Sequence, residues 1–472
     1  MALLAAVSAA PYLRGGAVWD DHSLIFGSLV SLDAAGLASL WTQPVGGVAG
    51  GGYYRPLALS LMAVLGRLGP MALHTGALVA HAASASMLLR LLRPAPAAVW
   101  GAALFAVHPL ASEVLGWSSA LPDALAVSFG LAGALAARRS LAAAAGLTLA
   151  ALLCKESAVL VLPFVLVAGR APGRAWGAWA VAAVAAGGLR VAAGATAAVS
   201  VAGKAGLAAP AVLWTVGSTL LPQPITAVRD LRALPADAVP VGVAALVLLV
   251  AVAAWRAPRD RLAWSGLALL VLAPIVALPT TLSGYLAAER YAYVGLLGLG
   301  AWVAAVLPAS PGPSRIGLAG AATLAVVLHA RLAAPWTDDH ALFSHATRAM
   351  PESAYAWHFL GEAEAMRGDF DGAARAFAAA LEREHPHPLD GERLLQALVL
   401  AGDGEAAWAH AQRLPQDGLT ADGVAWRARA ARDAGAIPAA RQLVGLLRTD
   451  TGWDGPDWVA QLAQDIGPGG HP

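Results

Sequence analysis

The chain has 472 residues, of which 58% are apolar and only 13% charged, and its mean hydropathy is +0.62. Soluble domains carry roughly 25% charged residues, so this composition argues against an ordinary water-soluble globule and predicts a membrane protein. No dense basic face with interleaved aromatic residues is visible, which argues against nucleic-acid binding. The single cysteine, Cys154, excludes an intrachain disulfide and a thiolate metal cluster.

Charge divides the chain near residue 333. Residues 1–333 hold 20 Lys and Arg against 10 Asp and Glu, whereas residues 334–472 hold 11 against 20. The first part is apolar and mildly basic, and the second has the composition of a soluble acidic domain. We therefore expect a multi-spanning membrane domain over 1–333 and an extramembrane domain over 334–472.

A helix needs ~20 apolar residues to cross the hydrocarbon core of a bilayer. The first apolar run lacks the basic segment that opens a signal peptide, so we interpret it as a short, clipped first span. The apolar runs together predict an all-α bundle of about 11 spans, at 1–14, 71–92, 96–112, 120–137, 139–154, 157–169, 175–193, 238–255, 262–279, 286–307 and 315–333.

The loops between these runs alternate in charge. One set holds a single acid, Asp260, and ten arginines, which are Arg90, Arg93, Arg138, Arg139, Arg170, Arg174, Arg256, Arg259, Arg261 and Arg315. The opposite set gathers Asp20, Asp21, Asp33, Glu113, Asp123, Glu156, Asp230, Asp237 and Glu289. The positive-inside rule makes the arginine-rich set cytoplasmic. With an odd number of spans, the acidic tail lies on the outer side.

Two predicted outer loops are long, at 15–70 and 194–237. Each contains a short apolar piece, over 57–68 and 208–221. These pieces are too short to cross the bilayer in pairs, so we expect interfacial helices that lie on the membrane.

The tail shows a period near 34 residues over 352–449. The first unit fits the tetratricopeptide pattern W-x2-L-G followed by A-x3-F-x2-A, whereas the later units are degenerate. Such an array either caps the membrane domain or presents a partner-binding groove. The glycines predicted to form helix–helix turns are Gly368, Gly402 and Gly435, each followed by a small packing residue, at Ala373, Ala407 and Ala440.

Adjacent carboxylates follow the first span at Asp20 and Asp21. A carboxylate at a membrane face can accept a proton from an acceptor hydroxyl. The alternative is that Asp21 caps a short helix that starts near Ser23, and the local sequence alone favours this cap.

Further polar residues stand at the outer ends of later spans. His108 either orients a phosphate or satisfies a carbonyl, and Glu113 follows it by about one helical turn. Lys155 can neutralise a phosphate as a point charge, or Lys155 and its neighbour Glu156 can extend to the interface.

The segment Glu289-Arg290-Tyr291 offers a planar guanidinium suited to phosphate oxygens, and its tyrosine also suits a membrane-anchoring aromatic belt. Arg55 is either another phosphate contact or a surface anchor. Together these residues place carboxylates, cations and a histidine on one membrane face. That combination suits a lipid-linked anionic donor whose phosphate needs cations and whose acceptor hydroxyl needs a base.

The order of these motifs carries a family resemblance. W-D-D stands at 19–21, Y-Y-R-P-L at 53–57, H-P-x3-E-x3-W at 108–117, C-K-E-S at 154–157 and E-R-Y-x-Y at 289–293, followed by the repeat tail. The chain resembles the transmembrane and tetratricopeptide repeat O-mannosyltransferase-like family of the GT-C glycosyltransferase superfamily, over nearly its whole length. The resemblance implies a protein of the bacterial cytoplasmic membrane.

The resemblance also implies a reaction. The donor would be a polyprenyl-phosphate-linked sugar, mannose or another hexose, transferred with inversion on the outer face to a protein, lipid or glycan. The first-loop acid of the family falls on Asp20 or Asp21, with a weak preference for Asp21. Further active-site motif positions fall on Glu113, Lys155, Glu156 and Arg290.

The chain departs from the family in having one convincing repeat, which leaves the nature of the acceptor open. A non-catalytic membrane scaffold that recruits envelope proteins through the tail is the alternative. A transporter is disfavoured because the acids gather outside rather than at mid-membrane. No complete metal-ligand set is predicted, so no cofactor is assigned, although a divalent cation beside the Asp pair stays an open alternative.

Overall fold

The computed structural model describes residues 1–26, 33–45, 54–195, 204–221, 225–308, 315–415, 421–449 and 457–466. Of the described residues, 78% are helical. Its β-structure within the described residues is one antiparallel pair, β1 (Arg229–Asp230) and β2 (Leu286–Ala287). The chain forms two compact units, Met1–His345 and Ala346–Pro472. The predicted division at residue 333 falls at the end of the last long helix of the first unit.

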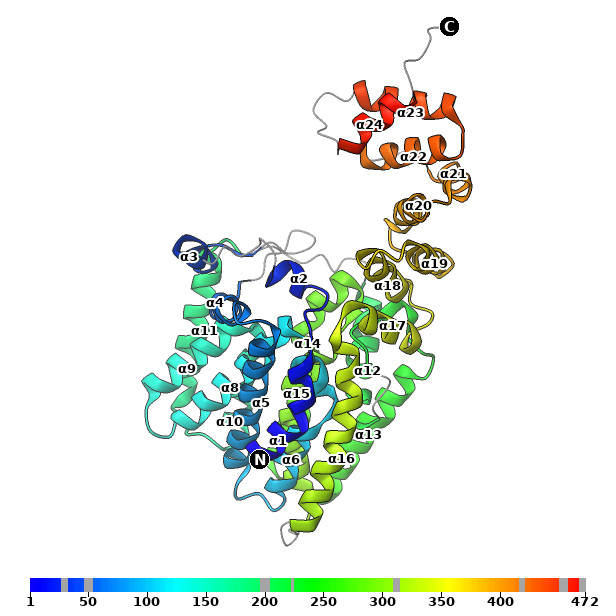
Figure 1. Ribbon diagram of the computed structural model, residues 1–472. Helices are drawn as coiled ribbons and strands as arrows, with labels where there is room; N and C mark the ends of the chain where they lie inside the picture. Colours follow the sequence, from blue (N-terminus) through cyan, green and yellow to red (C-terminus); the bar gives the residue numbers. More distant parts are fainter. Residues whose placement is uncertain are drawn as a thin grey trace. The chain divides into compact units, whose positions relative to one another are not determined.

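The first unit contains a helix in each of the predicted apolar runs, and Figure 1 shows these helices lying alongside one another. Among them α14 packs against α15, α8 against α9, and α6 against α15. In chain order they are α1 (Ala2–Ala9) with η1 (Ala10–Arg14), α5 (Pro70–Leu92), α6 (Ala98–Val107), α8 (Leu121–Ala136), α9 (Leu141–Cys154), α10 (Val161–Val167), α11 (Ala175–Ala192), α13 (Ala238–Arg256), α14 (Arg261–Gly284), α15 (Tyr293–Val306) and α16 (Arg315–Ala333).

Within the described residues, five of these helical segments are long and apolar enough to cross a bilayer. They are α5, Ser118–Ala136, α11, α13 and the Arg261–Pro279 part of α14. A sixth arises if α6 and the segment Pro109–Gly116, bent by 48° at their junction, form one broken span. Several long apolar helices therefore support a membrane protein, and the total of 11 spans stays a prediction.

Close helix packing around α15 depends on glycine. A methyl group at Gly101 of α6 would lie 2.0 Å from the carbonyl oxygen of Gly300 on α15. A methyl group at Gly298 would likewise lie 2.3 Å from the Gly266 carbonyl oxygen on α14. Backbones that approach this closely hold apolar helices together through van der Waals contact. The short helix η8 (Glu289–Ala292) leads directly into α15.

The two predicted outer loops contain short helices. The apolar pieces expected to be interfacial helices form α4 and α12, and α12 packs against α13 where Gly217 meets Gly242. The helices of these loops are α2 (Asp21–Leu24), α3 (Ala34–Thr42), α4 (Pro56–Gly66), η6 (Ala205–Leu207), α12 (Ala208–Leu220) and η7 (Leu231–Ala233). Residues 46–53 of the first of these loops lie outside the described residues.

The second unit is a series of helical hairpins, and α17 (Asp339–Ala349) leads into it from the first unit. The predicted turn glycines Gly368, Gly402 and Gly435 have φ values of +79°, +85° and +75°, which L side chains rarely adopt. The small residues predicted to follow these turns are fully buried. The helices are α18 (Ala354–Met366), α19 (Phe370–Leu381), α20 (Asp390–Ala401), α21 (Gly404–Ala411), α22 (Ala421–Asp433), α23 (Ile437–Thr449) and α24 (Asp457–Asp465).

Candidate active site

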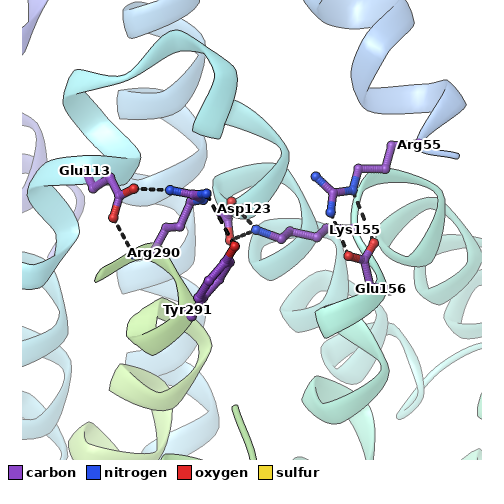
Figure 2. Close-up of polar contacts among 7 residues, drawn as sticks. All are labelled: Arg55, Glu113, Asp123, Lys155, Glu156, Arg290 and Tyr291. Carbon is purple, nitrogen blue, oxygen red and sulfur yellow. Dashed lines mark hydrogen bonds and ion pairs between the residues drawn. The ribbon is translucent and has the colours of Figure 1, made fainter. Parts of the chain in front are cut away.

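Three cationic side chains from distant parts of the sequence line one pocket, which we call the cation pocket (Figure 2). Arg55 precedes α4, Lys155 joins α9 to the short helix η5 (Glu156–Leu160), and Arg290 belongs to η8. An apolar wall comes from α14. The pocket is lined by Arg55, Asp123, Lys155, Glu156, Ser157, Ala273, Val276, Ala277, Arg290, Tyr291 and Val294.

Each cation of the pocket has its own carboxylate. The Lys155 Nζ lies 2.6 Å from both carboxylate oxygens of Asp123. Arg55 donates from Nη2 and Nε to the two oxygens of Glu156, at 2.6 and 3.2 Å.

Arg290 completes the set of pairs. Its guanidinium bonds one oxygen of Glu113, and its backbone N–H donates to the other at 2.8 Å. Glu113 therefore holds both the main chain and the side chain of Arg290.

The charged groups of the cation pocket shift one another's pKa values. Burial lowers the pKa of Lys155, and Asp123 opposes that shift. Burial alone would raise the pKa of Glu156, but the charge and hydrogen bonds of Arg55 outweigh it and hold this pKa at about 2. Glu156 is therefore ionised at neutral pH and keeps Arg55 oriented.

Aromatic rings fix Arg290 from two directions. Its guanidinium carbon lies 4.6 Å from the ring centre of Trp117 and 4.9 Å from that of Tyr291. Trp117 in turn stacks on Trp19, with ring centres 5.2 Å apart. Cation–π contacts of this kind orient a guanidinium without consuming its N–H donors. The Arg290 Nη2 contact to the Tyr291 hydroxyl is long, at 3.4 Å.

The backbone that presents the Asp pair is constrained. Trp19 has φ +54°, a region disfavoured for residues other than glycine. Its N–H donates to Asp339 Oδ1 at 2.6 Å, and His22 contacts Asp339 Oδ2 at 2.8 Å. Asp339 thus holds the segment before α2 in the conformation that places Asp20 and Asp21.

The two aspartates have different surroundings. The Asp21 carboxylate is fully buried and accepts hydrogen bonds from Val18 N at 3.1 Å, from Ser119 N at 2.8 Å and from Ser119 Oγ at 2.5 Å. Burial raises its pKa to about 6, against these bonds. The interpretation of Asp21 as an N-cap is wrong, because α2 begins at Asp21 and Asp20 occupies the N-cap position.

Asp20 is the more accessible carboxylate. It is exposed at the surface, and within the part of the chain that the structure describes it has no side-chain hydrogen bond. Although the residue reaches the surface, the protein around its carboxylate excludes part of the water and raises its pKa, which the nearby charge of Arg290 only partly offsets. The carboxylate that is both near Arg290 and open to a substrate is therefore Asp20 rather than the weakly preferred Asp21.

Two further predicted residues are engaged elsewhere. His108 accepts from Leu110 N at 3.2 Å through Nδ1 and donates from Nε2 to the Thr219 carbonyl at 3.0 Å. Its ring thus satisfies a carbonyl, which was the alternative to a phosphate contact. Glu289 is buried and accepts from Thr226 N at 3.0 Å and from the Arg229 guanidinium. We call Asp21, His108 and Glu289 the buried anchors.

Asp123 belongs to the predicted outward acids, but its local sequence does not place it in the site. It is a lone acid in the first turn of the otherwise apolar α8. An ionisable group at the edge of an apolar helix is costly unless it is paired, so this isolation was the available signal. Its partner Lys155 lies 32 residues away and could not be read from the local sequence.

Comparison of the chain with protein-family models, with curated proteins and with solved structures found no match.

Proposed function

We propose that this protein is a membrane glycosyltransferase of GT-C type, with about 11 spans, that transfers mannose or another hexose from a polyprenyl-phosphate donor to an acceptor hydroxyl. The observation that carries the proposal is the cation pocket. Three cations from three separate segments border one space, and α14 supplies an apolar wall beside them. Cations beside an apolar wall suit a phosphate group that is attached to a hydrocarbon chain.

In the proposed reaction, Asp20 activates the acceptor hydroxyl and the cation pocket holds the donor phosphate. The acceptor oxygen attacks the anomeric carbon, and the Asp20 carboxylate accepts its proton. The bond between that carbon and the phosphate oxygen breaks, and the electron pair leaves with the phosphate. Arg290 and Lys155 stabilise the charge that develops on the leaving oxygen. Attack from the face opposite the phosphate inverts the anomeric centre.

The remaining residues of the site position these groups. Glu113 holds Arg290 through two hydrogen bonds, and Glu156 holds Arg55 through two more. Tyr291 lies against both Arg290 and Lys155. Because a guanidinium has five N–H donors, Arg290 can keep Glu113 and still bind a phosphate oxygen.

The proposed orientation places the site and the second unit, as a tetratricopeptide-like domain, on the outer face of the bacterial cytoplasmic membrane. It rests on the alternating loop charges and the positive-inside rule. On that face the hairpin unit would meet protein, lipid or glycan acceptors.

The test is a transfer assay on the purified full chain in lipid nanodiscs. Radiolabelled polyprenyl-phosphate hexoses are supplied together with envelope material that contains proteins, lipids and glycans. We expect label to pass from the donor to an acceptor, and Arg290→Ala to lower the rate by about 100-fold or more. The matched control is Arg138→Ala, which removes an arginine whose Nη2 donates to the Arg170 carbonyl at 2.8 Å.

The control variant should transfer at the rate of the unchanged protein. Full transfer by a folded Arg290→Ala variant would contradict the assignment of the site. Absence of transfer from every donor, combined with capture of envelope proteins by the second unit, would instead favour the alternative function, a non-catalytic membrane scaffold.

A further inference from the structure

Three metal-binding side chains meet within the second unit, outside the proposed active site. His358 lies on α18, His387 lies in the loop between α19 and α20, and Asp390 is the first residue of α20. One ligand atom of each lies within 4.8 Å of the other two. His358 Nδ1 and Asp390 Oδ1 are 2.6 Å apart, and the two imidazole centres are 4.2 Å apart.

Asp390 organises this cluster from a fully buried position. One of its oxygens accepts from His358 Nδ1, and the other accepts from the backbone N–H of His387 at 2.7 Å. His358 is only 6% exposed, and its ring lies against Phe359 and Phe377. Packing and hydrogen bonds therefore hold two of the three groups in place, unlike residues that meet by chance on a surface.

Both imidazole rings have a nitrogen atom that is available to bind a metal ion. Among the described residues, the Nε2 atoms of His358 and His387 make no hydrogen bond. The His387 Nδ1 accepts only a long bond, 3.3 Å, from Leu389 N. His387 can therefore become a ligand without breaking a strong contact, whereas His358 binds by exchanging the proton that it shares with Asp390 for the ion.

We propose that His358, His387 and Asp390 bind one divalent transition-metal ion of the zinc class. Two imidazoles and a carboxylate form a donor set that zinc accepts, with bonds of about 2.0–2.2 Å. The ion takes the place of the proton between His358 Nδ1 and Asp390 Oδ1, and that proton passes to solvent. Small rotations of the side chains bring the ligand atoms to bonding distance. Three protein ligands leave a fourth tetrahedral position to water or to a ligand atom of a partner.

The ion would join successive hairpins of the unit. His358 belongs to the hairpin of α18 and α19, whereas Asp390 begins α20 of the next. A metal that binds only the folded form stabilises it by mass action. We expect saturating Zn²⁺ to raise the unfolding temperature of the second unit by roughly 5 °C or more.

The test uses the full chain in detergent, carrying an affinity tag without histidines and stripped of metal by a chelator. Co²⁺ is titrated in, and the visible absorption of tetrahedral cobalt is followed, with Zn²⁺ as the competitor. We expect one ion per chain by elemental analysis after gel filtration. His358→Ala and His387→Ala should each weaken Co²⁺ binding by about 100-fold.

His385→Asn is the matched control, because it removes an exposed imidazole from the same loop. Its φ of +62° is one that asparagine tolerates. This variant should still bind one ion. His387 is only half-buried, so His387→Ala should keep the fold, which circular dichroism checks.

No binding by the unchanged protein at micromolar Co²⁺ or Zn²⁺ would overturn the proposal and leave a metal-free His–Asp contact. Equal binding by His387→Ala, or equal loss in His385→Asn, would overturn it as well. Because no readout depends on sugar transfer, this outcome is independent of the proposed function.

Discussion

The cation pocket and the buried anchors both contain carboxylates drawn from the same predicted outer loops, yet the environments of these carboxylates differ. In the pocket, Arg55 holds the pKa of Glu156 at about 2. Among the anchors, burial raises the pKa of Asp21 to about 6 although three hydrogen bonds oppose the shift. The carboxylates of the pocket pair with cations around a shared space, whereas the buried Asp21 accepts its hydrogen bonds from uncharged groups of Val18 and Ser119. Position in a loop therefore does not assign a role.

The largest effect should separate Asp20 from Asp21. Asp20→Asn removes the proposed proton acceptor, and we expect the transfer rate to fall by about 10³-fold, within the range for general-base catalysis. Asp21→Asn should lower the unfolding temperature but leave the rate per folded molecule within about threefold, because Asp21 contacts only the protein. The measurement is single-turnover transfer on matched amounts of folded protein. Equal losses of transfer rate in the two variants would contradict the assignment of Asp20 as proton acceptor and of Asp21 as a buried anchor.

A smaller effect concerns the pair of Lys155 and Asp123. Lys155→Met leaves a buried carboxylate without its cation, which costs about 3–5 kcal/mol of stability, and it should lower transfer by about 100-fold. The double variant Lys155→Met/Asp123→Asn removes that orphaned charge. It should recover most of the unfolding temperature while transfer stays low.

The double variant distinguishes a role of Lys155 in sugar transfer from a role in the stability of the fold alone. If transfer returned together with stability, Lys155 would serve only the fold. Thermal unfolding and transfer measured on the same preparations give both answers.

The smallest effect is a pH dependence of stability from Asp21. Its folded pKa of about 6 lies above the usual 3.8, so the folded protein binds this proton more tightly than the unfolded chain. The stability gained from protonation is full below pH 3.8 and is lost as the pH rises through about 6. We expect the unchanged protein to lose on the order of 2 kcal/mol more stability than Asp21→Asn over this interval.

Thermal unfolding at pH 4.5 and pH 7.5 measures this difference. Parallel temperature shifts in the two proteins would show that Asp21 does not titrate there.

The sequence anticipated features that depend on local pattern. A helix occupies each predicted apolar run, and the turn glycines take positive φ. Arg55, Lys155 and Arg290 line one pocket, and their role as phosphate contacts stays a prediction. The long-range partners escaped prediction. The contacts that define the anchors join residues 98, 111 and 63 positions apart, and only the assembled helix bundle creates them. Exposed Asp20 could not be distinguished from buried Asp21 by adjacency alone.

We propose that the cation pocket binds the donor phosphate. The most direct measurement is the dissociation constant of sugar-free polyprenyl phosphate, determined in nanodiscs for the unchanged protein and for Arg290→Ala. Loss of one charged phosphate contact should weaken binding by about 30-fold, whereas Arg138→Ala should bind as the unchanged protein does. Equal affinity in a folded Arg290→Ala variant would contradict the account.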